Sequence, residues 1–281
     1  MAVMGFMLAI VLLVSSCGVG SESVYPSPGD DKVVIRFLHL WPESTSGQQH
    51  LIVTRIVRDF EREHPGIAVK VEVLDNESYK ERLKILSASN RLPDVGFTWA
   101  AGFLEPYAVG KRFAVLDDLM EGGLQDIFAP GTTEAYMNGG RLYALPLEFN
   151  IVPIFYNKKI FADLGLDVPD SYGAFKETVA ALSEAGVIPV ALGNRERWPG
   201  SHWFMYLADR FAGPNAVRDA INRTARFNVP SMKVAAREVQ ELVDMGAFSR
   251  GFNGMSNEEA RRLFVSGRAA MFMMGTWELP N

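Results

Sequence analysis

The sequence contains very few cysteine and histidine residues. Its 281 residues include a single cysteine, so no disulfide can form within the chain. The four histidines, His39, His50, His64 and His202, are scattered, and no cysteine–histidine spacing typical of a metal site is present. We therefore predict no metal site and no other cofactor.

Basic residues are also fewer than acidic residues. Lysine and arginine number 28 against 33 aspartates and glutamates, which gives a net charge of −5. Nucleic-acid binding needs basic surfaces that meet phosphates, so we expect no nucleic-acid partner. The G-x-S-x-G turn of serine hydrolases and a Cys–His nucleophile arrangement are both missing, which argues against proteolytic or esterase chemistry. The length is sufficient for two lobes, each with its own core.

The N-terminal segment has the pattern of a secretion signal. Residues 1–14 are almost wholly apolar, which is too short to span a bilayer comfortably and fits a signal-peptide core. Val14-Ser15-Ser16-Cys17 resembles a bacterial lipobox, in which the cysteine is acylated. We expect residues 1–17 to be a lipoprotein signal peptide with Cys17 as the lipidation site, and residues 18–32 to be a flexible tether. A simple membrane anchor, or a cleaved signal with an incidental cysteine, is the alternative.

After the tether, strand-like and helix-like patterns alternate. Residues 51–63 carry Ile52, Ile56 and Phe60 at helical spacing on a face that we expect to be buried, with charges on the other face. Residues 67–73 alternate apolar with other side chains, as in a strand. Ser78 followed by Glu81 predicts the start of another helix. The alternation predicts an α/β fold with mainly parallel sheets.

Further along, turn and cap residues mark the boundaries of the elements. Asn138-Gly139-Gly140 between apolar flanks predicts a hairpin. We expect residues 193–200 to be a polar loop that carries Trp198, and residues 201–211 to be the next helix. Ser256 and Glu259 form the pattern of a capping box, and an apolar strand that ends near Gly275 follows.

Four of the five tryptophans fall at predicted strand exits or in loops: Trp41, Trp99, Trp198 and Trp277. Only Trp203 lies on a predicted helix face. Sugars pack their C–H faces on flat aromatic rings, while their hydroxyl groups need hydrogen bonds. The alternative for each of the four is packing between helix and sheet without a ligand.

Polar side chains near these tryptophans supply candidate hydrogen-bonding groups for a carbohydrate. They are Glu43, Glu148, Asn150, Asn194, Arg195 and Glu196. For Glu43 and Glu196 a solvated surface carboxylate is the favoured alternative.

Three groups of residues carry a family resemblance in the expected order. They are Pro93–Trp99, Tyr143–Pro146 with Phe155–Asn157, and Phe264–Met271 running to Gly275-Thr276-Trp277. Together they resemble bacterial extracellular solute-binding proteins of ABC importers, close in pattern to the maltose-binding group.

The resemblance implies a two-lobe periplasmic-binding-protein-like fold with the ligand held between the lobes. We expect lobe 1 at residues 33–146, and the hinge crossing with a partial lobe 2 at residues 147–281. Members of the family continue further, so we expect the chain to be C-terminally truncated.

Site residues follow from the same resemblance. Trp99 and Trp277 match aromatic positions of the two lobes, and Glu148 lies near an acidic position of the cleft. Trp198 falls in a loop that supplies another aromatic. The loop with Glu43, which follows Trp41, often holds a polar ligand contact in the family. With Asn194, these are the predicted ligand-binding residues, and none is predicted to be catalytic.

The sequence thus predicts a monomeric, lipid-anchored, extracytoplasmic receptor. Its expected partners are a mono- or oligosaccharide and the transmembrane permease subunits of an ABC importer. Two alternatives remain: a sugar-sensing or adhesive lipoprotein without a transport role, and a glycosidase that uses Glu148 and Glu196 as a carboxylate pair.

Overall fold

The computed structural model describes residues 32–121 and 123–279. The predicted signal peptide, Cys17 and the tether up to residue 31 lie outside the described residues. The chain divides into two compact units, which we call unit 1 (Met1–Ser44 and Gln49–Thr98) and unit 2 (Thr45–Gln48 and Trp99–Asn281). The division into lobes at residues 146 and 147 stays a prediction.

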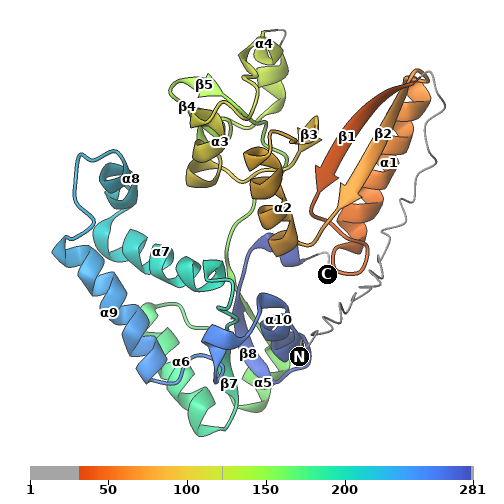
Figure 1. Cartoon of the computed structure of the whole chain (residues 1–281). Coiled ribbons are helices and arrows are strands. Elements are labelled where there is room, and N and C mark those ends of the chain that lie inside the picture. Colours follow the sequence, from red (N-terminus) through yellow and green to blue (C-terminus); the bar gives the residue numbers. More distant parts are fainter. Residues whose placement is uncertain (1–31, 122, 280–281) are drawn as a thin grey trace, which may run out of the picture. The chain divides into compact units, whose positions relative to one another are not determined.

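Unit 1 is built around a three-stranded parallel sheet of order β2-β1-β3. The strands are β1 (Val33–His39), β2 (Ile67–Val73) and β3 (Val95–Gly96), connected through helices α1 (Gly47–Glu63) and α2 (Asn76–Ala88) (Figure 1). The parallel pairing confirms the alternation of strand and helix predicted for this part of the sequence.

The buried face of α1 differs from the prediction by one position. Ile52 and Ile56, expected to point inward, are 58% and 59% exposed. Val57 is buried instead, against Val69 and Val71 of β2. Successive residues of a helix are rotated by about 100°, so a shift of one residue moves the whole apolar stripe. The predicted inward face was therefore wrong at Ile52 and Ile56 but right at Phe60, which packs against the same valines.

Helix α2 also begins earlier than predicted. Asp75, not Ser78, is its N-cap, and the Asp75 carboxylate accepts hydrogen bonds from the backbone N–H groups of Glu77 and Ser78. Tyr79 is fully buried and donates its hydroxyl proton to the carbonyl of Phe97 at 2.5 Å, which ties the helix to the residues after β3.

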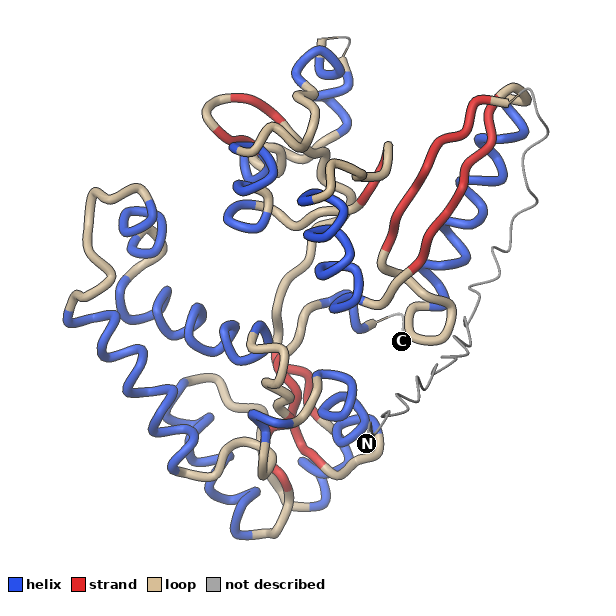
Figure 2. The backbone as a smooth tube through the Cα atoms, in the orientation of Figure 1, coloured by secondary structure: helices blue, strands red, loops and turns tan. Residues whose placement is uncertain are grey.

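Unit 2 is mainly helical (Figure 2). Its helices are α3 (Glu105–Val109), α4 (Asp117–Met120), α5 (Lys158–Asp163), α6 (Tyr172–Glu184), α7 (Trp198–Ala212), α8 (Ala216–Ile221), α9 (Pro230–Asp244) and α10 (Asn257–Val265). Its strands are β4 (Met137–Asn138), β5 (Arg141–Leu142), β6 (Ile154–Tyr156), β7 (Ile188–Ala191) and β8 (Ala269–Met273).

The predicted hairpin is confirmed. Strands β4 and β5 pair antiparallel around Gly139 and Gly140, whose φ angles are +57° and +78°. Two successive residues with positive φ are the requirement of the tight hairpin turn that matches strand twist, so the Asn-Gly-Gly sequence explains the turn.

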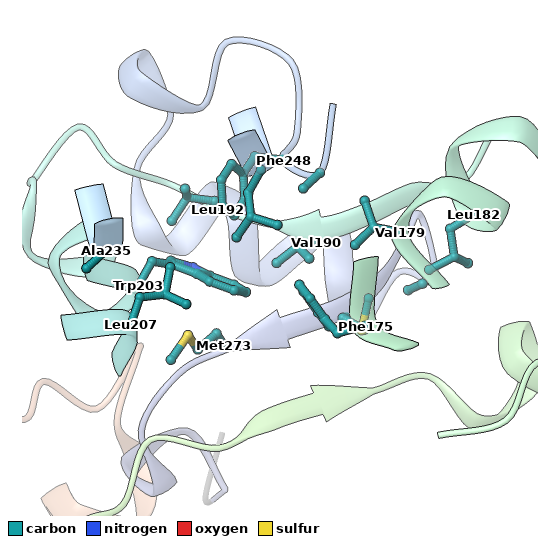
Figure 3. Packing of buried hydrophobic residues seen from close by; sticks show 14 of the residues in the cluster. Phe175, Val179, Leu182, Val190, Leu192, Trp203, Leu207, Ala235, Phe248 and Met273 are labelled. Carbon is teal, nitrogen blue, oxygen red and sulfur yellow. The ribbon is translucent and has the colours of Figure 1, made fainter. Parts of the chain in front are cut away.

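Strand β8 is the centre of the second sheet, of order β6-β8-β7. It pairs parallel to β7 and antiparallel to β6, and all five of its residues are buried. Phe175, Val179 and Leu182 of α6 pack in the core beside this sheet, as their spacing predicts (Figure 3). Trp203 of α7 is 3% exposed in the same core, which confirms its assignment to a helix face.

Candidate functional site

Trp277 lies just beyond the end of β8. It belongs to a short 3₁₀ helix, η5 (Thr276–Glu278), and is partly buried. Because β7 and β8 run parallel, the segments that follow them leave the same edge of the sheet. This is the edge at which open α/β sheets bind ligands. A Cβ atom on Gly275 would lie 2.0 Å from the Trp277 ring, so only glycine leaves room for the indole.

The segment after β7 brings Trp198 to the same place. The centroids of the Trp198 and Trp277 rings lie 6.2 Å apart in an edge-to-face arrangement, at 63°. Trp198 is the first residue of α7 and not part of the loop, so the expected boundary at residue 201 was wrong. Pro199 explains the early start, because proline is favoured in the first turn of a helix.

His202 completes the group. It lies four residues after Trp198, and residues four apart share one face of a helix. Its ring centroid is 5.6 Å from that of Trp198 and 6.1 Å from that of Trp277. Burial lowers the pKa of His202, so the imidazole is neutral at pH 7. We call Trp198, His202 and Trp277 the ring cluster.

A buried carboxylate lies directly beside the ring cluster. The Glu278 side chain is 13% exposed and faces Arg261 at 3.8 Å. The Asn257 amide donates to the Glu278 Oε1 at 3.4 Å. Burial raises the pKa of Glu278, and Arg261 with hydrogen bonds from Asn257 and Trp277 opposes that rise. These contacts hold η5, and with it Trp277, against the start of α10.

Asn150, a candidate from the sequence, lies near the ring cluster through Thr276. The Thr276 hydroxyl donates to the Asn150 Oδ1 at 3.0 Å, and the backbone N–H of Ile151 donates to the same hydroxyl oxygen at 3.3 Å. The segment that precedes β6 is therefore fixed alongside the residue before Trp277.

Asn194 has its side chain engaged within the protein. Its Oδ1 accepts from the backbone N–H of Gly200 at 3.0 Å, and its Nδ2 donates to Asn253 at 2.8 Å. Both bonds order the residues around the start of α7. A ligand contact by Asn194 stays a prediction.

Glu196 is not the solvated carboxylate that we favoured. Its side chain is 13% exposed and lies 3.2 Å from Arg195. Its Oε2 accepts from the backbone N–H of Asn257 at 3.1 Å. Asn257 is the first residue of α10, and the positive end of a helix dipole favours a carboxylate there. Glu196 thus links the loop after β7 to α10.

The predicted capping box at the start of α10 is confirmed. The backbone N–H of Glu259 donates to the Ser256 hydroxyl at 3.1 Å, and the Ser256 N–H donates to the Glu259 carboxylate at 2.7 Å. The Glu259 carboxylate also accepts a hydrogen bond from the Ser256 hydroxyl at 2.8 Å, and the two bonds that it accepts from Ser256 lower its pKa.

The two other acidic candidates, Glu43 and Glu148, are exposed. The charge of Glu148 acts on Tyr136 and, after burial, is the second cause that raises the pKa of that phenol. A role for either carboxylate in ligand binding stays a prediction.

Trp41 belongs to an aromatic group within unit 1. Its ring stacks on His39 at 5.7 Å and meets Phe97 edge-to-face at 5.3 Å. Its backbone N–H donates to the His39 Nδ1 at 3.3 Å, and its carbonyl lies 3.1 Å from the His50 Nδ1. Trp41 is half-buried and stays a predicted ligand contact.

Trp99 is the residue at which unit 2 resumes after β3. Its ring is partly buried and meets Phe103 edge-to-face at 4.7 Å. Its assignment to the ligand site also stays a prediction.

The structure therefore joins Trp198 and Trp277 and adds His202, Asn257, Arg261 and Glu278, which the sequence reasoning missed. One signal for His202 was present: its distance of four residues from Trp198. It was not recognised because the helix was expected to begin only after Trp198. Glu278 was adjacent to a predicted site residue, but nothing in the sequence showed that its carboxylate is buried.

Two hollows lie elsewhere in unit 2. One, of about 660 Å³, lies along α10 beside Arg262 and Arg268. The other, of about 170 Å³, is bounded by Asn194, Arg197 and Trp203. Neither is lined by a residue of the ring cluster, so we base the candidate site on the rings and their polar neighbours.

Two negative observations concern the described residues alone. Within 32–121 and 123–279, no group of three or more His, Cys, Asp and Glu side chains is placed to hold a metal ion. Over the same ranges, every helix is too short or too polar to cross a bilayer.

Two known binding proteins are similar in sequence to this chain over most of its length. The chain is 26% identical over 279 residues to the multiple sugar-binding protein of Streptococcus mutans, covering 96% of this chain and 62% of that protein. It is 25% identical over 280 residues to an uncharacterized ABC transporter extracellular-binding protein of Pyrococcus horikoshii, with coverage of 96% and 62%. The chain thus spans less than two thirds of the length of these relatives.

A solved structure is similar over most of the described residues. It comes from work on xylan utilization by the thermophilic bacterium Caldanaerobius polysaccharolyticus. The two chains are 29% identical with a TM-score of 0.81, over 86% of this chain and 61% of the other. The predicted fold class is confirmed: a mixed α/β chain whose structural neighbours are two-lobe periplasmic binding proteins.

The model of bacterial extracellular solute-binding proteins matches residues 46–279, which is most of the chain. An extracellular family agrees with the predicted extracytoplasmic location. A family of receptors agrees with the prediction that the chain is not an enzyme. This chain belongs to the bacterial extracellular solute-binding proteins.

Proposed function

We propose that this chain is the solute receptor of an ABC importer, that it binds a mono- or oligosaccharide, and that it delivers the sugar to a membrane permease. The ring cluster is the observation that carries the proposal. Two indole rings and an imidazole meet at the edge of the sheet where β7 and β8 end. Flat rings with buried polar neighbours suit a ligand that has apolar C–H faces and many hydroxyl groups.

The similarity to a multiple sugar-binding protein supports the substrate class, and the similarity to an ABC transporter binding protein supports the permease partner. Trp99 and Glu148 are proposed to complete the site with Trp277 when the ligand draws the two lobes together. A ligand favours the closed state in proportion to the contacts it makes only there. The mature protein is proposed to be monomeric and attached to the membrane through a lipid on Cys17.

A glycosidase is disfavoured by the position of Glu196. One of its oxygen atoms accepts the backbone N–H of Asn257, and the other faces Arg195. A general acid needs access to the glycosidic oxygen, whereas the Glu196 carboxylate is already engaged by Asn257 and Arg195.

Isothermal titration calorimetry on the full chain tests the proposal. The wild type is titrated with a panel of neutral mono- and oligosaccharides. Trp277→Ala removes the stacking face, and Tyr206→Ala is a matched control because Tyr206 is a 43% exposed ring on α7 outside the ring cluster. We expect at least one sugar to bind, and the loss of one aromatic platform to weaken it by at least tenfold. Tyr206→Ala should bind as the wild type does. Unchanged affinity in Trp277→Ala would contradict the proposed site.

A further inference from the structure

His202 has an unusual position within the ring cluster. Its Nε2 is buried and has no hydrogen-bond partner among the residues that the structure describes. The centroid of the His202 ring lies 5.6 Å from that of Trp198, edge-to-face, and 6.1 Å from that of Trp277, in a tilted arrangement. Buried polar atoms are almost always paired in native proteins, and leaving one unpaired is costly. A water molecule or a ligand hydroxyl can supply the hydrogen bond that this nitrogen lacks within the described chain.

We propose that His202 contacts the bound saccharide directly, through a hydrogen bond between its Nε2 and a sugar hydroxyl that forms when the sugar packs on Trp277. The inference rests on the function proposed above and adds to it a residue that selects hydroxyl groups.

The chemistry of a neutral imidazole favours this class of ligand. One of its nitrogens donates and the other accepts, depending on the tautomer. A hydroxyl group both donates and accepts, so it satisfies Nε2 in either tautomer. A carboxylate only accepts and an ammonium group only donates, so each fits one tautomer alone. His202 can thus pair with a hydroxyl group of a neutral polyol in either tautomer.

Access to Nε2 requires a movement of the rings that cover it. Trp277 lies on the three-residue helix η5, directly after Gly275, and is only partly buried. A sugar that takes the place of the Trp198–Trp277 ring contact reaches His202 while it retains stacking on an indole face. The contacts of Glu278 with Asn257 and Arg261 hold the backbone of η5, so the exchange is a movement of the indole side chains and not of the helix.

Three substitutions separate a ligand contact from a structural role. His202→Phe keeps a ring of similar size and removes both nitrogens. His202→Gln restores a nitrogen and an oxygen at the distance of Nε2, and His202→Asn restores them at the distance of Nδ1. We expect His202→Phe to weaken sugar binding about tenfold, the value of one hydrogen bond to a neutral group. His202→Gln should recover part of the affinity and His202→Asn none.

If the inference is correct, the substitution that weakens sugar binding should not lower the thermal stability of the protein. Replacing an unpaired buried nitrogen with carbon is neutral or stabilising, so His202→Phe should have the same Tm as the wild type or a higher one. In the wild type, titration with the sugar should shift the ¹⁵N resonance of the His202 Nε2 and leave that of the exposed His64 unchanged.

The results that would overturn the inference are distinct from those that overturn the receptor. If a sugar binds the wild type and Trp277→Ala weakens it, but His202→Phe binds normally, only the role of His202 is refuted. Loss of affinity together with a lowered Tm in both His202→Phe and His202→Gln also refutes it, because that pattern is structural. If no sugar binds the wild type, the proposed function fails, and this inference fails with it.

Discussion

Folding strongly alters the titration of His39. It is 1% exposed at the end of β1, between Phe37 and Trp41. Burial, and secondly the charge of His50, lower its pKa from 6.5 to about 4. The folded protein therefore keeps His39 neutral at a pH at which the unfolded chain has already bound a proton.

We predict that this difference makes the stability of unit 1 depend on pH. Because the folded pKa is the lower one, the stabilisation is complete above pH 6.5 and is lost as the pH falls toward 4. A difference of about 2.5 pKa units corresponds to at most about 3 kcal/mol. Urea unfolding at pH 7, 5.5 and 4.5 measures it.

The matched control uses two histidines of opposite exposure. His39→Gln should remove most of the loss between pH 6.5 and 4, while His64→Gln, at an exposed position, should keep it. An identical pH dependence in the wild type and His39→Gln would contradict the assignment to His39.

At the level of single residues, the sequence selected two members of the ring cluster and missed the third. The argument that tryptophans outside helical and strand periodicity mark a site selected Trp198 and Trp277, which the structure places in contact. His202 was not selected. It shares a helix face with Trp198 only because α7 begins at Trp198, and the helix was expected to begin at residue 201. Burial of a carboxylate such as Glu278 arises only from the fold and has no signature in local sequence.

The capping box at the start of α10 is an element whose stability can be measured separately. Ser256→Ala removes the acceptor of the Glu259 N–H and should cost about 1 kcal/mol in the free energy of unfolding. Ser266→Ala, at the other end of the same helix, removes only a hydrogen bond to the Leu263 carbonyl and should have little effect. Equal losses in the two variants, measured by urea unfolding, would show that the cap does not stabilise the helix.

Gly275 sets the position of η5. Its φ of −73° suits any residue, but a Cβ atom would fall on the Trp277 ring. We predict that Gly275→Ala displaces Trp277, changes the near-ultraviolet circular dichroism and weakens sugar binding at least as much as Trp277→Ala does. Gly173→Ala is the control, because a Cβ there meets no atom within 4 Å. An unaltered aromatic spectrum in Gly275→Ala would contradict the packing described here.

Elements were predictable where one signal dominated. The capping box at Ser256, the Gly-Gly hairpin and the inward face of α6 follow from the sequence because each depends on local chemistry or a clear period. Helix α1 shows the opposite case. Its apolar residues occupy several adjacent positions, and only contact with β2 selects Val57 over Ile56 as the buried one.

For the whole molecule, the order of the motifs predicted the family, and the family match confirms it. The predicted lobe boundary could not be decided from the sequence, since compactness depends on contacts between distant residues. The same is true of the ligand, because a stacking face accepts many sugars.

A receptor and a glycosidase differ in what happens to the bound sugar. We predict that prolonged incubation of the full chain with a bound oligosaccharide releases no reducing ends, because the Glu196 carboxylate is engaged by the Asn257 N–H and by Arg195. A reducing-sugar assay on the wild type and Glu196→Gln checks this. Release that disappears in Glu196→Gln would restore the enzymatic alternative.

A crystal structure of the full chain with the tightest-binding saccharide of the calorimetric panel tests the account most directly. We predict that the C–H face of a sugar ring lies on the indole of Trp277. One hydroxyl group of the sugar should be within hydrogen-bonding distance of the His202 Nε2. A sugar bound away from the ring cluster, with Trp198 and Trp277 still in contact as they are here, would contradict it.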